Sequence, residues 1–188
     1  ADDASFSRFA VDDEHVVSAR IQGAAGSPGV VDGQKALYAD VFPSVDVEML
    51  SLEDGLKETF ILKSADAPTR FTFPLTLTGL TARLSESGGV EYVDAQGVVR
   101  ALTPAGFMED SNIDPRSGEG AWSDGVTYRL VTDESGGVAL QVVLDRGWVR
   151  DPARKFPIRV DPSYNRTATG DTFADRSRPT ADRSTSQL

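Results

Sequence analysis

The sequence predicts an all-β protein: an antiparallel β-sandwich, built as one sandwich or as two small stacked ones, with little or no helix. Two observations support this fold class. Apolar and polar residues alternate in short runs along much of the 188-residue chain, as they do in strands with one buried face. Gly, Asp and Ser, which favour turns, separate these runs. We expect the sandwich to cover residues 1–163, and the polar residues 164–188 to begin a following module.

Two short strands and a loop are expected at the N-terminal end. Residues 6–11 give a brief alternation, and residues 15–22 (HVVSARIQ) form a second strand. Residues 23–33 are rich in glycine and contain a proline, so they are expected to form a loop.

The segment 37–63 is expected to be a β-hairpin at the centre of a sheet. The Phe42-Pro43 pair leads into its first strand, and Asp54-Gly55 supplies its turn. Along that strand, apolar side chains share one face and acidic ones the other, because successive side chains point in opposite directions. The apolar set is Val45, Val47 and Met49, and the acidic set is Asp46 and Glu48.

A short helix over residues 52–63 is the alternative for the second half of this segment. Residues 51–54 fit a capping box, and Leu52, Leu56 and Phe60 have helical spacing. The hairpin is favoured because Gly55 would cost a helix about 1 kcal/mol. Residues 59–61 (Thr-Phe-Ile) also favour a strand.

The clearest alternation lies in residues 70–79 (RFTFPLTLTG). Pro74 has no amide hydrogen, so this strand is expected at a sheet edge or with a bulge. The longest loop is expected at residues 109–125, and residues 134–137 (ESGG) are expected to turn a hairpin. Further strands are expected at residues 90–93, 98–103, 126–132, 138–145 and 156–160.

The composition argues against several classes of function. A net charge of −10 opposes contact with a phosphate backbone, so nucleic acid is not expected as a partner. No apolar run reaches the length of about 18 residues that a membrane span needs. The chain has no cysteine, which removes disulfides, thiolate metal sites and cysteine nucleophiles. Its start at Ala1 fits a mature secreted form or a boundary within a longer protein.

No catalytic motif stands out, and the chain is expected not to be an enzyme. His15 is the only histidine, and no nucleophile motif accompanies it, so a surface position is expected. Paired carboxylates could hydrolyse a glycan, which keeps a glycan hydrolase as one alternative. The acidic candidates Glu48, Glu58 and Glu91 are expected on the solvated faces of strands.

A calcium site is considered in the longest loop. Asp110, Asn112 and Asp114 place oxygen ligands at alternate positions, as calcium loops do. Pro115 stands where such a loop needs glycine, and no Glu follows at the twelfth position. Either these residues bind Ca²⁺, or they form an acidic surface loop stiffened by Pro115; no other cofactor is expected.

Two further features are considered for binding and covalent chemistry. Trp122, in the longest loop, could stack on a sugar and make the chain a carbohydrate-binding domain for cell-wall or environmental glycans, whereas Trp148 is expected to fill the core. An exposed aromatic row beside the loop would favour the glycan function. Lys57 and Lys63 lie on expected strands and could form an intramolecular amide cross-link to Asn or Asp.

Several segments resemble a known kind of module. They are residues 38–47 (YADVFPSVDV), 55–58 (GLKE), 60–62 (FIL), 71–75 (FTFPL), 104–110 (PAGFMED), 148–149 (WV), 151–154 (DPAR), 156–158 (FPI) and 160–162 (VDP). Together they resemble the N-terminal β-rich module of large secreted actinobacterial proteins of the Rhs (YD-repeat) and DNRLRE-domain kind, over residues 35–163. Residues 171–174 (DTFA) and the polar run after them resemble the opening of a DNRLRE module.

The resemblance implies a secreted, cell-surface or toxin-delivery context. The chain would be a non-catalytic structural or adhesive front end, and its partners would be other modules of the same large chain, with glycan as a further candidate. No functional residue is carried over.

Overall fold

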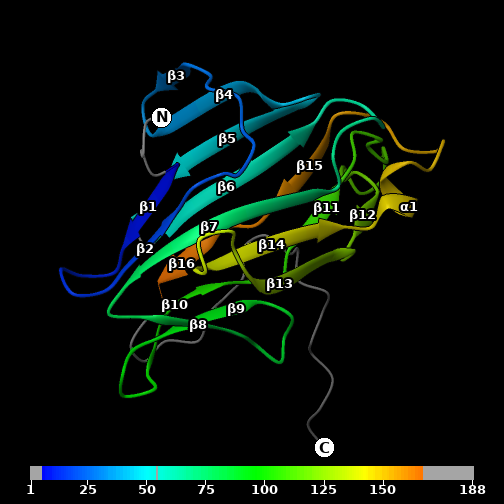
Figure 1. Cartoon of the computed structure of the whole chain (residues 1–188). Helices are drawn as coiled ribbons and strands as arrows, with labels where there is room; N and C mark the ends of the chain where they lie inside the picture. Colours follow the sequence, from blue (N-terminus) through cyan, green and yellow to red (C-terminus); the bar gives the residue numbers. More distant parts are fainter. Residues whose placement is uncertain (1–5, 54, 167–188) are drawn as a thin grey trace, which may run out of the picture.

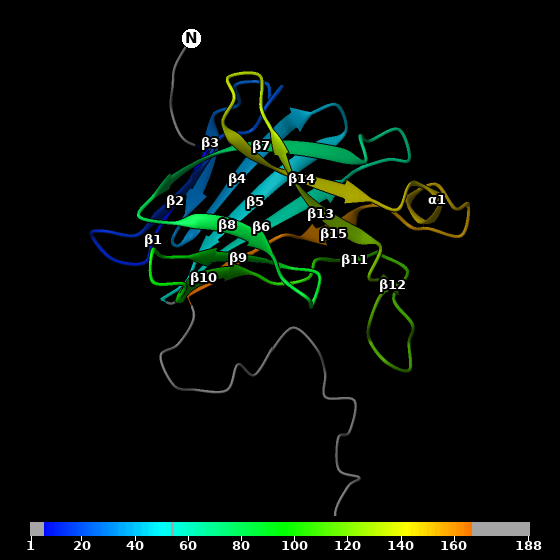
Figure 2. The ribbon, with the colours of Figure 1, turned by 60° about the horizontal axis from the view of Figure 1, so that its bottom comes forward.

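The computed structural model describes residues 6–53 and 55–166, and it confirms the expected all-β sandwich. Two sheets pack face to face, with the smaller one lying across the larger one (Figure 1 and Figure 2). The smaller sheet has five strands in the order β1-β2-β7-β14-β13. These are β1 (Ser7–Ala10), β2 (Val16–Ala19), β7 (Arg70–Thr78), β13 (Val126–Thr132) and β14 (Val138–Leu144).

The larger sheet joins 11 strands of the described residues and branches at β6. One edge of β6 pairs with β5, which continues to β4 and β3. The other edge pairs with β15 near one end and with β16 near the other. The strands are β3 (Gly29–Asp32), β4 (Lys35–Phe42), β5 (Val45–Ser51), β6 (Gly55–Leu62), β8 (Thr81–Leu84), β9 (Val90–Val93), β10 (Val99–Thr103), β11 (Phe107–Glu109), β12 (Trp122–Ser123), β15 (Ile158–Asp161) and β16 (Tyr164–Arg166).

The central hairpin forms as the alternation predicts, and the alternative helix over residues 52–63 is wrong. Strands β5 and β6 pair antiparallel from Val45↔Leu62 to Ser51↔Leu56. The three apolar side chains of β5 are buried on the core face. Asp54, the expected turn residue, lies outside the described residues. At the other end of β5, Ser44 adopts a positive φ of 60° in the tight connection from β4.

The aromatic side chains of β6 and β7 join the two sheets. Phe60 of β6 contacts Phe71 and Phe73 of β7, with ring centroids 4.8 and 5.7 Å apart. All three rings are buried. Burying such rings gives the most stabilisation per residue in a core, so this contact anchors the sandwich.

Pro74 does not mark an edge, and that expectation is wrong. Strand β7 lies inside the smaller sheet, between β2 and β14. The carbonyl of Pro74 accepts a hydrogen bond from the backbone N of Arg20, one residue beyond the end of β2. Since the N and O of one strand residue point the same way, the missing amide hydrogen faces Arg20. This pair therefore lacks the second of its two possible backbone hydrogen bonds, while the bond from Gln22 N to the Thr72 carbonyl forms beyond it.

The structure contains several strands and one helix that were not expected from the sequence. Strand β3 lies within the expected loop 23–33, and β11 and β12 lie at the two ends of the expected loop 109–125. Strand β16 continues the sheet past residue 163, between β6 and β10. A single-turn helix, α1 (Arg146–Val149), follows β14, and the side chain of Asp145 caps it by accepting from the backbone N of Gly147 and Trp148.

Candidate functional site

The loop between β11 and β12 is organised by one buried carboxylate. Asp110 Oδ1 accepts hydrogen bonds from the backbone N of Asn112 and of Ala121, both at 2.9 Å. Its Oδ2 accepts one from the backbone N of Lys155 at 3.2 Å and forms an ion pair with Arg154 Nη1 at 3.2 Å. Burial alone would raise the pKa of Asp110, but these amides and the guanidinium outweigh it and lower the pKa. Asp110 therefore closes the loop and ties it to the segment before β15.

These contacts give no support to the expected calcium site. Both oxygens of Asp110 are already occupied, while Asn112 and Asp114 are exposed. Asp114 Oδ1 accepts from the backbone N of Arg116. Among the described residues, no cluster of three or more His, Cys, Asp or Glu side chains has the arrangement of a metal site. Calcium binding stays a prediction, and the loop has the structure of an acidic surface loop.

An aromatic pair lies beside this loop. The ring of Trp122 stacks on that of Phe107, with centroids 6.2 Å apart and an angle of 26° between the planes. Trp122 is 46% exposed, and Phe107 is half-buried. Trp148, by contrast, packs against the core and carries the guanidinium of Arg154 over its ring at 4.8 Å. An exposed apolar ring with a fixed orientation is the arrangement that stacks on a sugar face.

A buried polar cluster lies where the larger sheet branches. We expected Glu58 on a solvated face, but its side chain is 2% exposed on the core side of β6. Burial raises the pKa of Glu58 to about 7; a hydrogen bond with Ser7 opposes this shift, and the charge of Asp161 adds to it. The signal was present in the sequence, because Glu58 has the same strand parity as the buried Phe60 and Leu62.

Tyr128 of the smaller sheet belongs to the same cluster. Burial raises its pKa well above the usual value, and the charges of Asp161, Tyr92 and Glu58 add to that shift. Within the described part of the chain, Tyr128 Oη and Glu58 Oε1 are buried without hydrogen-bond partners. Burying these polar groups lowers the stability of the folded protein, and ionisation of Glu58 would lower it further.

The two lysines considered for a cross-link both pair with aspartates. Lys57 Nζ lies 3.2 Å from Asp161 Oδ2, and its side chain is 41% exposed. Lys63 Nζ contacts Asp40 and Asp46 at 2.5 and 2.7 Å. The side chains of Lys57 and Lys63 are 41% and 37% exposed, so water stabilises their charged forms, which favours a salt bridge over condensation to an amide.

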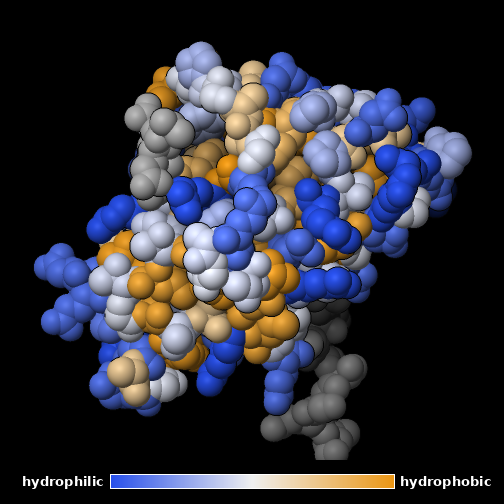
Figure 3. Space-filling model, in the orientation of Figure 1, coloured by the Kyte–Doolittle hydropathy of each residue, from blue (hydrophilic) through white to orange (hydrophobic). Residues whose placement is uncertain are grey.

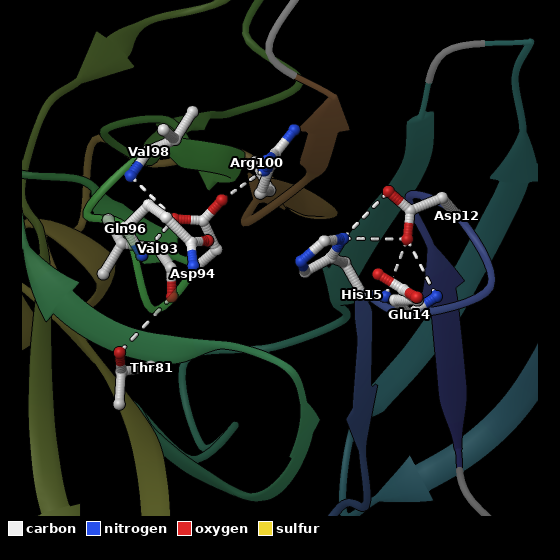
Figure 4. Close-up of polar contacts among 9 residues, drawn as sticks. All are labelled: Asp12, Glu14, His15, Thr81, Val93, Asp94, Gln96, Val98 and Arg100. Carbon is white, nitrogen blue, oxygen red and sulfur yellow. Dashed lines mark hydrogen bonds and ion pairs between the residues drawn. The ribbon is translucent and has the colours of Figure 1, made fainter.

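The only histidine, His15, bonds to Asp12 in a local turn, and Asp94 organises a second turn after β9 of the larger sheet (Figure 4). His15 Nδ1 lies 2.8 Å from both oxygens of Asp12, and this hydrogen bond lowers the pKa of Asp12. Asp94 accepts from the backbone N of Gln96 and Val98 and pairs with Arg100 at 2.7 Å. His15 is half-buried, although a surface position was expected.

The other acidic candidates lie in separate ion pairs. Glu48 contacts Lys35 at 2.6 Å and Arg159 at 2.9 Å, and Glu91 contacts Arg83 at 2.7 Å. No contact found among the described residues joins Glu48 to Glu91 or either of them to Glu58. A glycan hydrolase needs two carboxyl groups facing one cleft, so the described residues provide no support for that alternative.

Comparison with known proteins relates the chain to nucleases and to a wall-associated protein. It is 36% identical over 155 residues, 82% of its length, to the tRNA(Glu)-specific nuclease WapA of Bacillus subtilis subsp. natto and to the tRNA nuclease WapA of Bacillus subtilis strain 168. It is 32% identical over 85 residues, 45% of its length, to a wall-associated protein of Geobacillus stearothermophilus, of which it covers 33%. No family model and no solved structure matches the chain.

The chain spans only 6% and 7% of the length of these two nucleases, so it corresponds to one segment of each of them. The wall-associated relative confirms the expected secreted or cell-surface location. None of the helices in the described residues is long and apolar enough to cross a membrane.

Two expectations are contradicted by these relatives. The chain was expected not to be an enzyme and to have no nucleic-acid partner, yet relatives are named as tRNA nucleases. The reasoning failed because it used the net charge and motifs of one segment, and a segment of 6% or 7% does not report the electrostatics or catalytic groups of such a protein.

Proposed function

We propose that this chain is the wall-associated β-sandwich module of a large toxin-type protein with nuclease activity towards tRNA. The observation that carries the proposal is the 36% identity over 155 residues with nucleases that are named as acting on tRNA. The relative named as a wall-associated protein supports the location. The nuclease activity is proposed for the full-length protein, of which this chain is one segment.

Within that protein, the proposed role of the module is structural or adhesive. Two features support this role. The core joins two sheets through buried aromatic side chains, and the loop after β11 is tied to the body by four contacts of Asp110. The chain has no cysteine, so this body is held together without disulfides. The resemblance to the front-end modules of Rhs and DNRLRE-type proteins supports the same placement, although its part at residues 171–174 lies outside the described residues.

The test compares the full-length protein with a variant that lacks residues 1–166 and with the isolated chain. Two quantities are measured for each: cleavage of total tRNA, and co-sedimentation with purified cell walls. We expect the full-length protein to cleave tRNA, and both it and the isolated chain to sediment with walls. If the full-length protein leaves tRNA intact, the nuclease part is wrong. If the deletion does not reduce co-sedimentation, the wall part is wrong.

We also propose a second candidate function, contact with a wall glycan through Phe107 and Trp122. The observation that favours it is the exposed Trp122 ring, held in orientation by the half-buried Phe107 below it. Asp110 fixes the backbone on both sides of this platform, because it binds the amides of Asn112 and Ala121. A rigid ring loses little entropy on stacking, which suits it for a sugar.

Trp122→Ala tests this function in a pull-down with purified wall polysaccharide. The matched control is Ile113→Ala, which removes another exposed apolar side chain from the same loop. We expect Trp122→Ala to reduce the bound fraction at least fivefold and the control to leave it unchanged. Equal binding of both variants and the wild type would contradict the glycan platform.

A further inference from the structure

Strand β3 forms an uncovered edge of the larger sheet. It pairs with β4 from Gly29↔Tyr38 to Asp32↔Lys35, and with no other strand of the described residues. All four of its residues are exposed, and Val30 and Val31 are each 71% exposed. Because neighbouring side chains of a strand point to opposite faces, the sheet is uncovered on both sides here. Figure 1 shows β3 at the margin of the molecule, at the upper left.

This edge is protected at its ends, where Pro28 precedes the strand and Asp32 closes it, but not at its centre. Natural edges are protected by charged side chains, prolines or bulges. Strand β8, at the end of another branch of the same sheet, carries Arg83 in an ion pair with Glu91 of β9. In β3 the two central residues are instead branched and apolar, and hydrophobic surface is visible at that corner of the molecule (Figure 3, upper left). Both the backbone and the side chains of β3 therefore favour a further strand.

We propose that a β-strand from another part of the same polypeptide pairs with the free edge of β3 and covers Val30 and Val31. The partner is a short apolar segment that extends the larger sheet by one strand, with its backbone bonded to residues 29–32. Its alternate side chains lie over the valines, one on each face.

A partner within the same polypeptide fits better than a second copy of the chain. This inference rests on the proposed function, in which the chain is one segment of a protein like its relatives, of which it spans 6% and 7%; other segments of such a protein are present at high effective concentration. Two copies, each with a net charge of −10, would repel each other. An edge of four residues also offers far less contact than the roughly 1,200 Å² that a stable interface between separate chains needs.

Hydrogen exchange measured by mass spectrometry tests this pairing, on the isolated chain and on the full-length protein. We expect the amides of residues 29–33 to exchange at least tenfold more slowly in the full-length protein. The internal control is β8, whose exchange should be the same in both. Equal exchange of residues 29–33 in both proteins would overturn the proposal.

A double variant, Val30→Lys with Val31→Lys, separates pairing from folding. Because both side chains are exposed, the variant should leave the Tm of the isolated chain unchanged and should abolish the protection of residues 29–33 in the full-length protein. Protection that persists in the double variant would overturn the proposal. So would protection that appears in the isolated chain together with a doubled mass by light scattering, because it would assign the edge to a second copy. Neither result depends on tRNA cleavage or wall binding.

Discussion

Glu58→Gln should remove most of the pH dependence of stability between pH 5 and pH 8. Burial raises the pKa of Glu58 from its usual 4.5 to about 7 in the folded protein. The carboxyl is therefore neutral in the folded state over a range in which the unfolded chain is already ionised. Its favourable contribution is complete below pH 4.5 and is lost as the pH rises through 7.

The size of the effect follows from this difference in pKa. A shift from 4.5 to about 7 corresponds to about 3 kcal/mol, of which roughly 2 to 3 kcal/mol develops between pH 5 and pH 8. For a domain of this size, that lowers the Tm by about 5 to 10 °C over the same interval. Glutamine has a similar shape and no charge at either pH, so the variant should be more stable than the wild type at pH 8.

The assay is urea unfolding at pH 5 and pH 8 for the wild type, Glu58→Gln and Glu86→Gln, a control at an exposed turn position. Comparing the variant with the wild type cancels the contribution of every other titrating group. The reasoning would be refuted if Glu58→Gln and the wild type lost the same free energy of unfolding between pH 5 and pH 8.

Three further predictions concern packing, the loop and the lysines. A Cβ at Gly106 would lie 2.7 Å from Tyr128 Oη and 2.7 Å from Val126 Cγ1. Gly106→Ala should therefore lower the free energy of unfolding in urea by about 1–3 kcal/mol. The control is Gly26→Ala, where a Cβ would meet open space and the free energy should not change. Asp110→Asn should lower the free energy of unfolding by about 1–3 kcal/mol, with Asp114→Asn as the control. Wild-type melts with Ca²⁺ and with chelator test the predicted calcium site: a bound structural ion would raise the Tm in Ca²⁺, and coinciding melts would refute the site. The intact mass should equal that of the unmodified sequence, because Lys57 and Lys63 are charged partners of aspartates; a loss of one water would instead reveal an amide bond.

Strands with one buried face were predictable, and strands without one were not. The alternation in residues 45–49 and 126–132 records which side chains face the core, and the structure places them accordingly. The sequence of β3 shows no such alternation, because the strand is exposed on both faces and follows a glycine-rich stretch. Pro74 misled for a related reason: the sequence shows that an amide hydrogen is missing, but only the structure shows that the missing bond is a single one, opposite Arg20, with backbone pairing on either side of it.

The candidate sites show a similar division. The loop that contains Asp110 and the aromatic side chain of Trp122 could be located from the sequence. The contacts of Asp110 with Arg154 and Lys155 could not be located from the sequence, since these residues lie more than 40 positions after Asp110. The burial of Glu58 could have been inferred from its parity in β6, but its contact with Ser7 and the influence of Asp161 depend on the tertiary fold.

The branching of the larger sheet at β6 also sets the order in which the protein can be completed. One edge of β6 pairs with β5, its neighbour in the chain. The other edge pairs with β15 and β16, which come about 100 residues later, as the pairing of Phe60 with Val160 shows. During synthesis from the N-terminus, that second edge stays open until residues 158–166 leave the ribosome. Contacts so distant in sequence form slowly, so the nascent chain exposes an unfinished sheet for longer than a protein of local hairpins would.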